Sequence, residues 1–406
     1  MWQGAGIVKL VDSSVAPSPE RDGCLRAAAA IAADRGGAVH EIWFDIPARY
    51  GDAISRAGNP WLVLMLPPAM AAGEDIALPL PVDPHLAENL RGRMHFWHAA
   101  FPELRPAGID APLLEDAAQP GARRAMFFSG GVDSTFTLLR HDRSAAGCGG
   151  GPVDDLLFVA GFGIPLADRA ETELAGRHLA RVAAAHGKEL VQVFANLRGL
   201  DTAYRRNWLL FYGCALGALG HLLDRRYGEI VISAGLGYAD RPVTGSHPVT
   251  DPLLGSRRLR FVQDGSSFTR LEKTRAIAEA GAPLAALRVC WEGRRHDNCS
   301  RCRKCLLTMA TLDLLGFRGR APSFDWSGYD PVALARVFVH SEVQDIFFGE
   351  VLAEAGRRGR ADIAAPVAAA LRRSRRARAV LARTSRLPFL WRFEHQIGRA
   401  FLGRQG

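Results

Sequence analysis

Residues 125–141 read AMFFSGGVDSTFTLLRH. A short apolar run leads into two glycines, an aspartate and two serines, and a helical pattern follows. The order predicts a strand, a tight turn and a helix. The first N–H groups of a helix are unpaired and carry a partial positive charge, and glycine lets the backbone approach an anion closely. The turn therefore predicts a polyphosphate site.

The turn offers a small set of candidate ligands for that polyphosphate. Its serine hydroxyls can donate to phosphate oxygens, whereas Asp133 repels phosphate and is better suited to Mg²⁺ or to a loop amide. No lysine follows, so the motif is not the GxxxxGK[ST] loop. The alternative is an ordinary helix capped by Asp or Ser after a turn. The candidates are Ser129, Gly130, Gly131, Asp133 and Ser134.

The chain around this turn alternates strand-like and helix-like segments. The strand-like runs are apolar throughout, as expected for strands that are buried on both faces, and strands joined by helices favour parallel pairing. Residues 119–316 are therefore predicted to form an α/β domain with a parallel sheet. Strands are expected at 125–128, 154–163, 189–196 and 228–236, and helices at 133–141, 168–187 and 205–226.

Two further segments flank this domain. Residues 1–118 are predicted to form a small accessory α+β domain, and residues 317–406 an Arg-rich helical extension. Residues 115–124 are typical of a linker. In the first segment, strands are expected at 4–11, 38–46 and 60–68, and helices at 21–36 and 84–101.

Composition indicates a cytoplasmic protein. The chain has 406 residues, 48% of them hydrophobic, and no apolar run approaches the roughly 18 residues of a membrane span. The start lacks the pattern of a signal peptide. The net charge is +9, but residues 357–406 alone hold thirteen Arg, no Lys and two acidic residues. The basic character therefore belongs to the C-terminal tail.

Four of the seven cysteines follow the pattern C-x8-C-x2-C-x2-C, at Cys290, Cys299, Cys302 and Cys305. Four thiolates at this spacing can surround one Zn²⁺ in a closed, structural site. An iron–sulfur cluster and a redox or sulfur-relay cysteine are the alternatives. The other cysteines are expected to be small core residues; they are Cys24, Cys148 and Cys214.

The string SGGVDS resembles the PP-loop of the ATP pyrophosphatase superfamily, whose members cleave ATP to AMP and pyrophosphate. The resemblance implies an adenine nucleotide alpha-hydrolase-like fold in which the five turn residues hold the pyrophosphate end of ATP, with Mg²⁺. It also implies that adenine lies beside the end of the second strand. The residues there are Val159, Ala160 and Gly161.

The PP-loop followed by this cysteine spacing resembles the 7-cyano-7-deazaguanine synthase family of queuosine precursor biosynthesis, over about residues 124–316. The family's Tyr-Pro-Asp-Cys-Arg substrate loop is replaced by RPVTGSHPVTDPLLGS at 241–256. The adenylating core is therefore expected here, but not the deazaguanine substrate. Other positions that match the family are Arg206, Asn207, Gly235, Asp240, Lys273 and Thr274.

The resemblance implies an AMP-forming ligase that adenylates a carboxylate for attack by ammonia or an amine, giving an amide or a nitrile. Asp133, Ser134, Lys273 and His247 are the candidate catalytic residues. His247 would accept a proton from the amine; a capping histidine and a solvated surface lysine are the alternatives for His247 and Lys273. Further polar candidates are Asp240, Arg241, Asp251 and Arg257.

Two other functions stay open, a tRNA sulfurtransferase of the PP-loop class and a non-catalytic nucleotide-sensing module. The acceptor could be a small molecule or a carboxylate on a partner protein. The tail predicts an anionic partner, either RNA or a membrane surface, or else a solvated helix packed on the body. The sequence predicts no oligomeric state.

Overall fold

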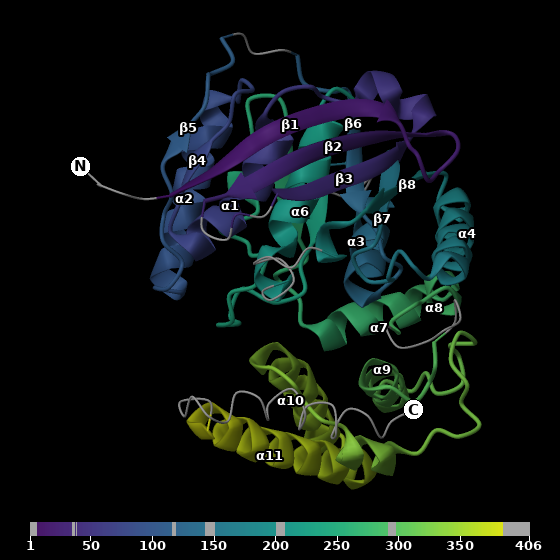
Figure 1. Cartoon of the computed structure of the whole chain (residues 1–406). Helices are drawn as coiled ribbons and strands as arrows, with labels where there is room; N and C mark the ends of the chain where they lie inside the picture. Colours follow the sequence, from purple (N-terminus) through teal and green to yellow (C-terminus); the bar gives the residue numbers. More distant parts are fainter. Residues whose placement is uncertain are drawn as a thin grey trace.

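The computed structural model describes residues 6–34, 37, 39–115, 119–142, 151–199, 208–290 and 298–384. Ten strands form one mostly parallel sheet, in the order β10-β9-β6-β7-β8-β3-β2-β1-β4-β5, and helices flank it (Figure 1). Five of these strands are parallel neighbours in the sheet. They are β6 (Arg123–Phe127), β7 (Asp155–Ala160), β8 (Glu189–Ala195), β9 (Tyr227–Ser233) and β10 (Arg260–Asp264).

The order of these five strands creates a switch point. From β6 the chain runs outward to β7 and β8, then returns to the other side of β6 for β9 and β10. Ligands of open α/β sheets bind outside the carboxyl ends of the strands at such a point. The predicted strands and helices of residues 119–236 are confirmed. The helices are α3 (Val132–Asp142), α4 (Arg169–Ala185) and α6 (Trp208–Leu222), with a short turn η3 (Leu197–Gly199).

The N-terminal segment extends the same sheet. β1 (Ile7–Pro17), β2 (Cys24–Ala33) and β3 (Val39–Pro47) pair antiparallel, and β3 pairs antiparallel with β8. β4 (Asp75–Ala77) and β5 (Ile109–Asp110) add parallel strands beyond β1. One apolar cluster runs from Val8 to Phe261. Residues 1–118 therefore share both a sheet and a core with the α/β segment.

Residues 21–36 were expected to form a helix, and this prediction is wrong. Residues 24–33 form β2, which is hydrogen-bonded on both sides, to β1 and to β3. The alanine run has high helix propensity, but propensity is a weak preference that tertiary pairing overrides. Ala27, Ala28 and Ala29 are buried. Their small side chains suit a strand on which other parts of the chain pack closely.

Residues 60–68 were expected to form a strand, and this prediction is also wrong. They belong to α1 (Asn59–Ala72), which continues through Pro67 and Pro68 although neither has an N–H for the helix. A short, fully apolar run does not distinguish a buried helix from a buried strand. α1 packs on α6, which is apolar on all sides as well. The predicted helix at 84–101 is confirmed as α2 (Pro84–Ala100), and η1 (Ala48–Ala53) precedes α1.

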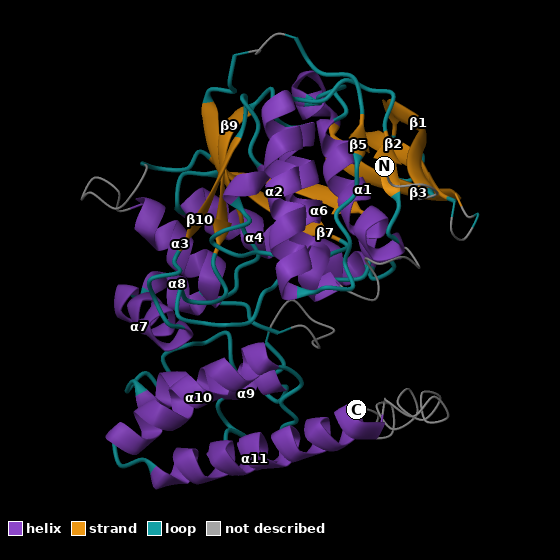
Figure 2. Ribbon diagram, turned by 90° about the vertical axis from the view of Figure 1, so that its left-hand side faces the viewer, coloured by secondary structure: helices purple, strands orange, loops and turns teal. Residues whose placement is uncertain are grey.

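The C-terminal helices lie beneath the carboxyl edge of the sheet (Figures 1 and 2). The last ones share their own apolar cluster, as expected for a helical extension. None of the described helices is both long and apolar enough to cross a membrane. These elements are α7 (Arg270–Ala280), α8 (Ala282–Ala285), α9 (Arg303–Leu314), η5 (Pro331–Arg336), α10 (Glu342–Arg357) and α11 (Ala361–Thr384), whereas η4 (Pro252–Leu254) precedes β10 and packs on α2.

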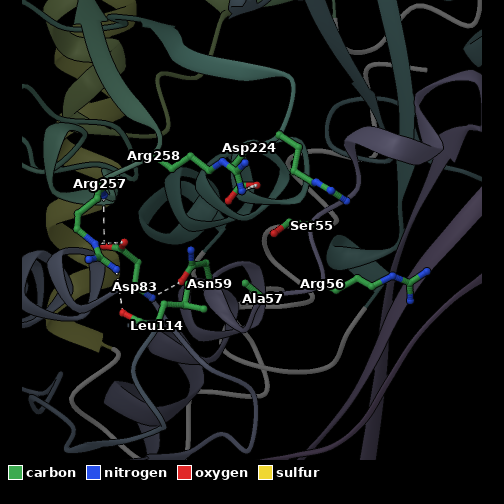
Figure 3. A pocket seen from close by; sticks show the side chains of 10 residues that line it. Ser55, Arg56, Ala57, Asn59, Asp83, Leu114, Asp224, Arg257 and Arg258 are labelled. Atoms are coloured by element: carbon green, nitrogen blue, oxygen red, sulfur yellow. Dashed lines mark hydrogen bonds and ion pairs between the residues drawn. The ribbon is translucent and has the colours of Figure 1, made fainter. Parts of the chain in front are cut away.

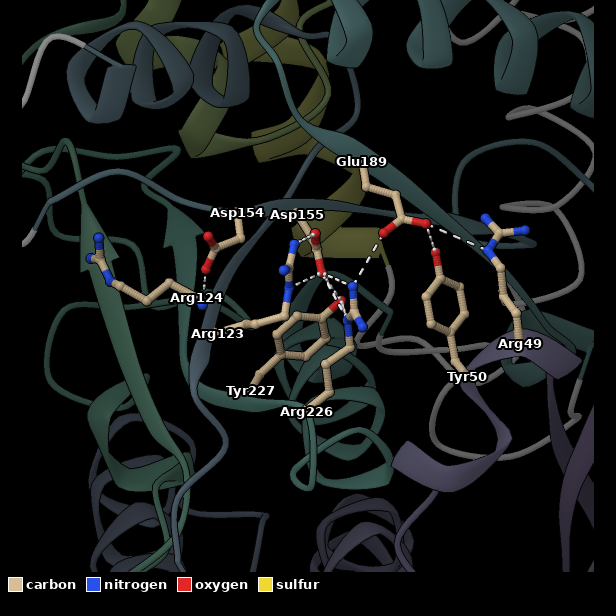
Figure 4. A network of polar contacts seen from close by, with 9 residues as sticks. All are labelled: Arg49, Tyr50, Arg123, Arg124, Asp154, Asp155, Glu189, Arg226 and Tyr227. Atoms are coloured by element: carbon tan, nitrogen blue, oxygen red, sulfur yellow. Dashed lines mark hydrogen bonds and ion pairs between the residues drawn. The ribbon is translucent and has the colours of Figure 1, made fainter.

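A polar network closes the amino edge of the sheet (Figure 4). The buried carboxylate of Asp155 accepts hydrogen bonds from Arg123 (Nε, 3.2 Å), Arg226 (Nε, 2.9 Å) and the Tyr227 hydroxyl (2.8 Å). Glu189 accepts from Arg226 (3.2 Å) and from Tyr50 of the N-terminal segment (2.5 Å). The network therefore ties the first residues of β6, β7, β8 and β9 to one another and to η1.

Asp155→Asn is expected to destabilise the fold by about 3–5 kcal/mol, because it leaves Arg123 and Arg226 without their buried anion. Burial alone would raise the pKa of Asp155, but the hydrogen bonds from Arg123, Arg226 and Tyr227 outweigh it and the pKa lies below its usual value. The stabilisation is thus complete above the unfolded pKa of about 3.9 and is lost as the pH falls through the lower folded pKa.

Urea unfolding at several pH values measures this effect. The gap between wild type and Asp155→Asn should be full at pH 7 and should narrow below about pH 4. Asp154→Asn is the matched control, because Asp154 is exposed and, within the described part of the chain, its side chain accepts only from the Arg124 N–H. Equal, small losses in both variants would contradict the role of the network.

Candidate functional site

The glycine turn lies at the switch point, between β6 and α3. Gly130 has φ +73°, and a Cβ there would lie 2.8 Å from Leu179 Cδ2 on α4. The backbone angle therefore favours glycine, and a larger residue would also have to displace the Leu179 side chain. The Arg288 N–H donates to the Gly130 carbonyl at 2.9 Å. The turn is therefore held from both sides before any ligand binds.

The two serines of the turn bring hydroxyls and amides to one place. Their hydroxyl oxygens are 3.3 Å apart, and the Ser129 N–H points to Ser134 Oγ at 3.3 Å. The Gly131 N–H reaches Ser129 Oγ at 3.4 Å. Contacts of this length are weak hydrogen bonds. A phosphate oxygen could therefore replace them at little cost, which is what the predicted role of the turn requires.

Asp133 begins α3 and faces two cations from α7. Arg270 Nη1 is 2.7 Å from Oδ2, and Lys273 Nζ is 3.7 Å from Oδ1. Asp133 Oδ1 is buried and has no hydrogen-bond partner among the described residues. This oxygen is therefore the one that a cation or a ligand donor could still use.

Lys273 is not a solvated surface lysine. Its side chain is 1% exposed, and its ammonium donates to the Ala234 carbonyl at 2.6 Å, directly after β9. Burial lowers its pKa, although Asp133 opposes the shift. The lysine thus links the ends of the two strands that form the switch point, and it presents a partly dehydrated positive charge there.

Two further cations of this cluster were missed in the sequence. Arg270 precedes Lys273 by one helical turn, a spacing that places both on one face of α7 and was available as a signal. Burial and the charge of Arg270 lower the pKa of Lys304 on α9 to about 7, while Asp133 opposes them. Nothing in the sequence indicated that this part of α9 lies near α3. Arg270 and Lys273 thus contact the Asp133 carboxylate directly, and Lys304 is a third cation near enough to be affected by their charges.

The residues expected to lie beside adenine are next to the turn. Val159 and Ala160 end β7, the parallel neighbour of β6, and the Phe128 N–H donates to the Leu157 carbonyl at 2.8 Å. Gly161 has φ +98°, and a Cβ there would lie 2.0 Å from the Ala195 carbonyl oxygen. The close approach of β8 therefore accounts for this glycine without a ligand.

The described contacts of His247 are with α2 and with its own loop, not with the glycine turn. Its ring lies 5.0 Å from that of Phe96 on α2, and its Nδ1 accepts from the Val249 N–H at 3.2 Å. Its own N–H donates to Asp251 at 3.2 Å. Burial and the nearby charge of Arg93 lower its pKa. These contacts fix the loop on α2 and do not join His247 to Asp133 or Lys273.

Three of the other polar candidates of the substrate loop have structural partners, whereas Arg241 is exposed. Asp240 accepts from the Gly237 N–H at 2.7 Å, in the turn after β9. Asp251 is buried and accepts from Ser246 at 2.5 Å. Arg257 pairs with Asp83, the cap of α2. Arg206 and Asn207 lie outside the described residues.

The four cysteines gather in one cluster at the start of α9. Their sulfur atoms all lie within 4.8 Å of one another, with neighbouring Sγ–Sγ distances of 3.5, 3.8 and 3.9 Å. Four sulfurs at about 2.3 Å from a tetrahedral metal ion are about 3.8 Å apart. The cluster formed by Cys290, Cys299, Cys302 and Cys305 could therefore hold a metal ion.

Backbone N–H groups support the cluster and the segment beside it. The Cys302 N–H donates to Cys299 Sγ at 3.3 Å. The buried Asn298 carboxamide accepts from the Val289 and Cys290 N–H groups. Cys24 and Cys214 lie elsewhere, Cys214 within the main apolar cluster, and Cys148 is outside the described residues.

The described part of the Arg-rich tail packs on the body. Arg375 and Arg378 of α11 pair with Asp345, and Arg373 donates to the Val337 carbonyl at 2.8 Å. Arg372 and Arg376 are exposed. This agrees with the expectation of a solvated helix packed on the body, while residues 385–406 and their aromatic side chains lie outside the described residues.

Comparison of the chain with protein-family models finds no match, and comparisons with curated proteins and with solved structures find none either. Its function has to be inferred from the residues and their geometry.

Cys302→Ser is expected to abolish metal binding, because the remaining three sulfurs cannot close a tetrahedral site. Elemental analysis of the purified chain should give one metal ion in wild type and less than about a tenth of that in the variant. Cys24→Ser is the matched control and should retain the ion, since Cys24 lies on β2, apart from the cluster. Equal metal content in both variants would contradict the site.

Proposed function

We propose that this chain is an AMP-forming ligase of the PP-loop ATP pyrophosphatase superfamily, of the 7-cyano-7-deazaguanine synthase type. It would adenylate a carboxylate and join it to ammonia or an amine. The observation that carries the proposal is the group formed by the half-buried Asp133 and Arg270 and the buried Lys273 beside the glycine turn, at the switch point of the sheet. A carboxylate with an excess of cations suits a polyphosphate that arrives with a metal ion.

In this proposal the turn binds the β- and γ-phosphates. The N–H groups of Gly130 and Gly131 and the hydroxyls of Ser129 and Ser134 would donate to the phosphate oxygens. Asp133 Oδ1, buried and without a hydrogen bond among the described residues, fits a Mg²⁺ ligand. The ion, when bound, supplies charge neutralisation on the phosphates. Adenine would lie against Val159 and Gly161.

The proposed reaction consists of two displacements, first of pyrophosphate and then of AMP. A carboxylate oxygen of the acceptor attacks the α-phosphorus, the bond from that phosphorus to the bridging oxygen breaks, and pyrophosphate leaves. The amine nitrogen then attacks the acyl carbon, AMP leaves, and the nitrogen loses a proton. Arg270 and Lys273 would stabilise the charge that gathers on the departing pyrophosphate. His247 stays a candidate for the proton only with a substrate that reaches the loop at 241–256.

The metal in the cysteine cluster is proposed to be Zn²⁺ in a structural role. The cluster is closed by four sulfurs, three of them buried, so no position stays open for a substrate. It joins the segment after α8 to α9, and the first of these segments carries Arg288, whose N–H donates to the Gly130 carbonyl of the turn. Zinc would therefore act on catalysis only by positioning these elements.

The placement of the cysteines favours a ligase over a sulfurtransferase. A sulfur relay needs an accessible cysteine beside the nucleotide. In the described chain four cysteines form the candidate metal cluster, Cys214 is fully buried, and Cys24 lies on β2, apart from the turn. For the tail, an anionic partner stays a proposal that rests on Arg372, Arg376 and the residues beyond 384.

Asp133→Ala is expected to reduce carboxylate-dependent ATP–pyrophosphate exchange at least about 100-fold, because it removes the proposed metal ligand and leaves Arg270 unpaired. The assay follows labelled pyrophosphate into ATP with a panel of carboxylic acids. Exchange has to depend on the acid, and the nucleotide product of turnover has to be AMP.

Asp168→Asn is the matched control. Like Asp133, Asp168 lies at the start of a helix that packs on the sheet, but its described role is to cap α4 by accepting from the Glu171 N–H. It should retain nearly full exchange, because Asn is an equally good cap. Formation of ADP, or exchange that survives Asp133→Ala unchanged, would contradict the proposal.

A further inference from the structure

A cavity lies between the N-terminal segment and the α/β core (Figure 3). Its volume is about 360 Å³, within the range of small-molecule sites. Four arginines and two aspartates are among the residues that line it. They are Arg56, Arg225, Arg257, Arg258, Asp83 and Asp224.

The cavity is remote from the glycine turn. Asp224 and Arg225 directly precede β9, whereas the turn lies beside the far end of that strand. A strand advances by about 3.3 Å per residue, so the length of β9, from Tyr227 to Ser233, separates the two places by about 20 Å. The cavity therefore does not belong to the proposed ATP site.

One wall of the cavity is rigid before a ligand binds. Asp83 Oδ1 accepts from the Leu86 N–H at 3.0 Å, and its Oδ2 accepts from Arg257 Nε at 2.8 Å. The Asp83 N–H in turn donates to Asn59 Oδ1 at 2.8 Å. Arg257 also donates to the Leu114 carbonyl at 2.9 Å. These side chains thus hold a fixed arginine in the wall, as Figure 3 shows.

The other three arginines of the cavity have guanidinium N–H groups that are not used in hydrogen bonds to the described residues. Arg258 donates through Nε to the Gln119 carbonyl at 3.0 Å, and its Nη1 comes no closer than 3.9 Å to the buried Asp224 carboxylate. That distance is too long for a hydrogen bond. Arg56 and Arg225 are exposed, and the described residues give neither of them a hydrogen-bond acceptor. Three guanidinium groups at this cavity can therefore still bind an anion.

We propose that this cavity binds a phosphorylated small molecule of up to mononucleotide size. The four arginines exceed the two carboxylates by two positive charges, and a phosphomonoester carries a charge of about −1.5 to −2 at pH 7. One guanidinium group can donate two parallel hydrogen bonds to two oxygens of the same phosphate. The volume exceeds that of bare phosphate, so an organic group fills the remainder.

The ligand would also connect two parts of the chain. Arg56, Asn59 and Asp83 come from the N-terminal segment, and Arg225, Arg257 and Arg258 from the core. A ligand that binds only the folded state stabilises it by a free energy that rises with the logarithm of the ligand concentration above Kd. Binding should therefore raise the midpoint of thermal unfolding of the full chain.

The test uses AMP as the probe on the full-length protein. Equilibrium dialysis with labelled AMP measures affinity, and photolabelling with 8-azido-AMP followed by peptide mapping locates the bound nucleotide. Label in peptides that contain residues 55–59, 224–225 or 257–258 is expected, in addition to any label beside the turn. Arg258→Gln should weaken this binding by about 10- to 100-fold, as for loss of a hydrogen bond to a charged group.

Two further variants separate a site from general charge. The double variant Arg56→Gln/Arg225→Gln removes only exposed side chains and should fold, while AMP binding at the cavity weakens several-fold. Arg177→Gln, an exposed arginine of α4 paired with Glu173, is the matched control and should bind AMP as wild type does. ATP–pyrophosphate exchange should persist in Arg258→Gln, which distinguishes failure here from failure of the ligase proposal.

Three results would overturn the inference. Photolabel confined to peptides beside the turn would place AMP only at the proposed ATP site. Equal losses of AMP affinity in Arg258→Gln and Arg177→Gln would show that the net charge of the protein, and not a site at the cavity, determines AMP binding. Inorganic phosphate that competes as well as AMP would show that the organic group contributes nothing.

Discussion

The parallel pairing of β6 with both β7 and β9 is the constraint on which the site depends. Because the chain leaves β6 on one side and returns on the other, the loops after β6 and β9 separate and leave room above the sheet edge. The glycine turn occupies one of these loops, and Ala234 begins the other. Lys273 bridges them through its bond to the Ala234 carbonyl. The topology, more than any single side chain, thus determines where a ligand could lie.

The C-terminal extension reaches this site through α7. The Arg270 guanidinium lies 4.9 Å from the ring centroid of Phe347 on α10, and Glu350 accepts from the Leu271 N–H at 2.9 Å. Both contacts restrain the first turn of α7, where Arg270 meets Asp133. A buried, positively charged cluster is costly unless it is held and partly compensated. The helices after residue 341 therefore support the charge arrangement that the proposed reaction needs.

The sequence predicted the local parts of this arrangement better than the long-range ones. The strand, turn and helix at 125–141 and the four-cysteine cluster follow from spacing along the chain, and the structure confirms both. The alanine run of β2 was misread because sheet pairing overrode helix propensity. The partnership of Asp133 with Arg270 spans more than a hundred residues, and nothing local encodes it. The catalytic role of His247 was predicted from its position in the loop at 241–256. In the structure its surroundings depend on packing against α2, which the local sequence does not indicate.

We propose that the turn at residues 129–134 holds the phosphates of ATP for transfer of AMP. A crystal structure of the full chain with α,β-methylene-ATP and Mg²⁺ tests this most directly. We expect the β- and γ-phosphates on the amides of Gly130 and Gly131, with the metal on Asp133. Density for the nucleotide elsewhere, with the Asp133–Arg270 pair intact and the turn empty at saturating ligand, would contradict it.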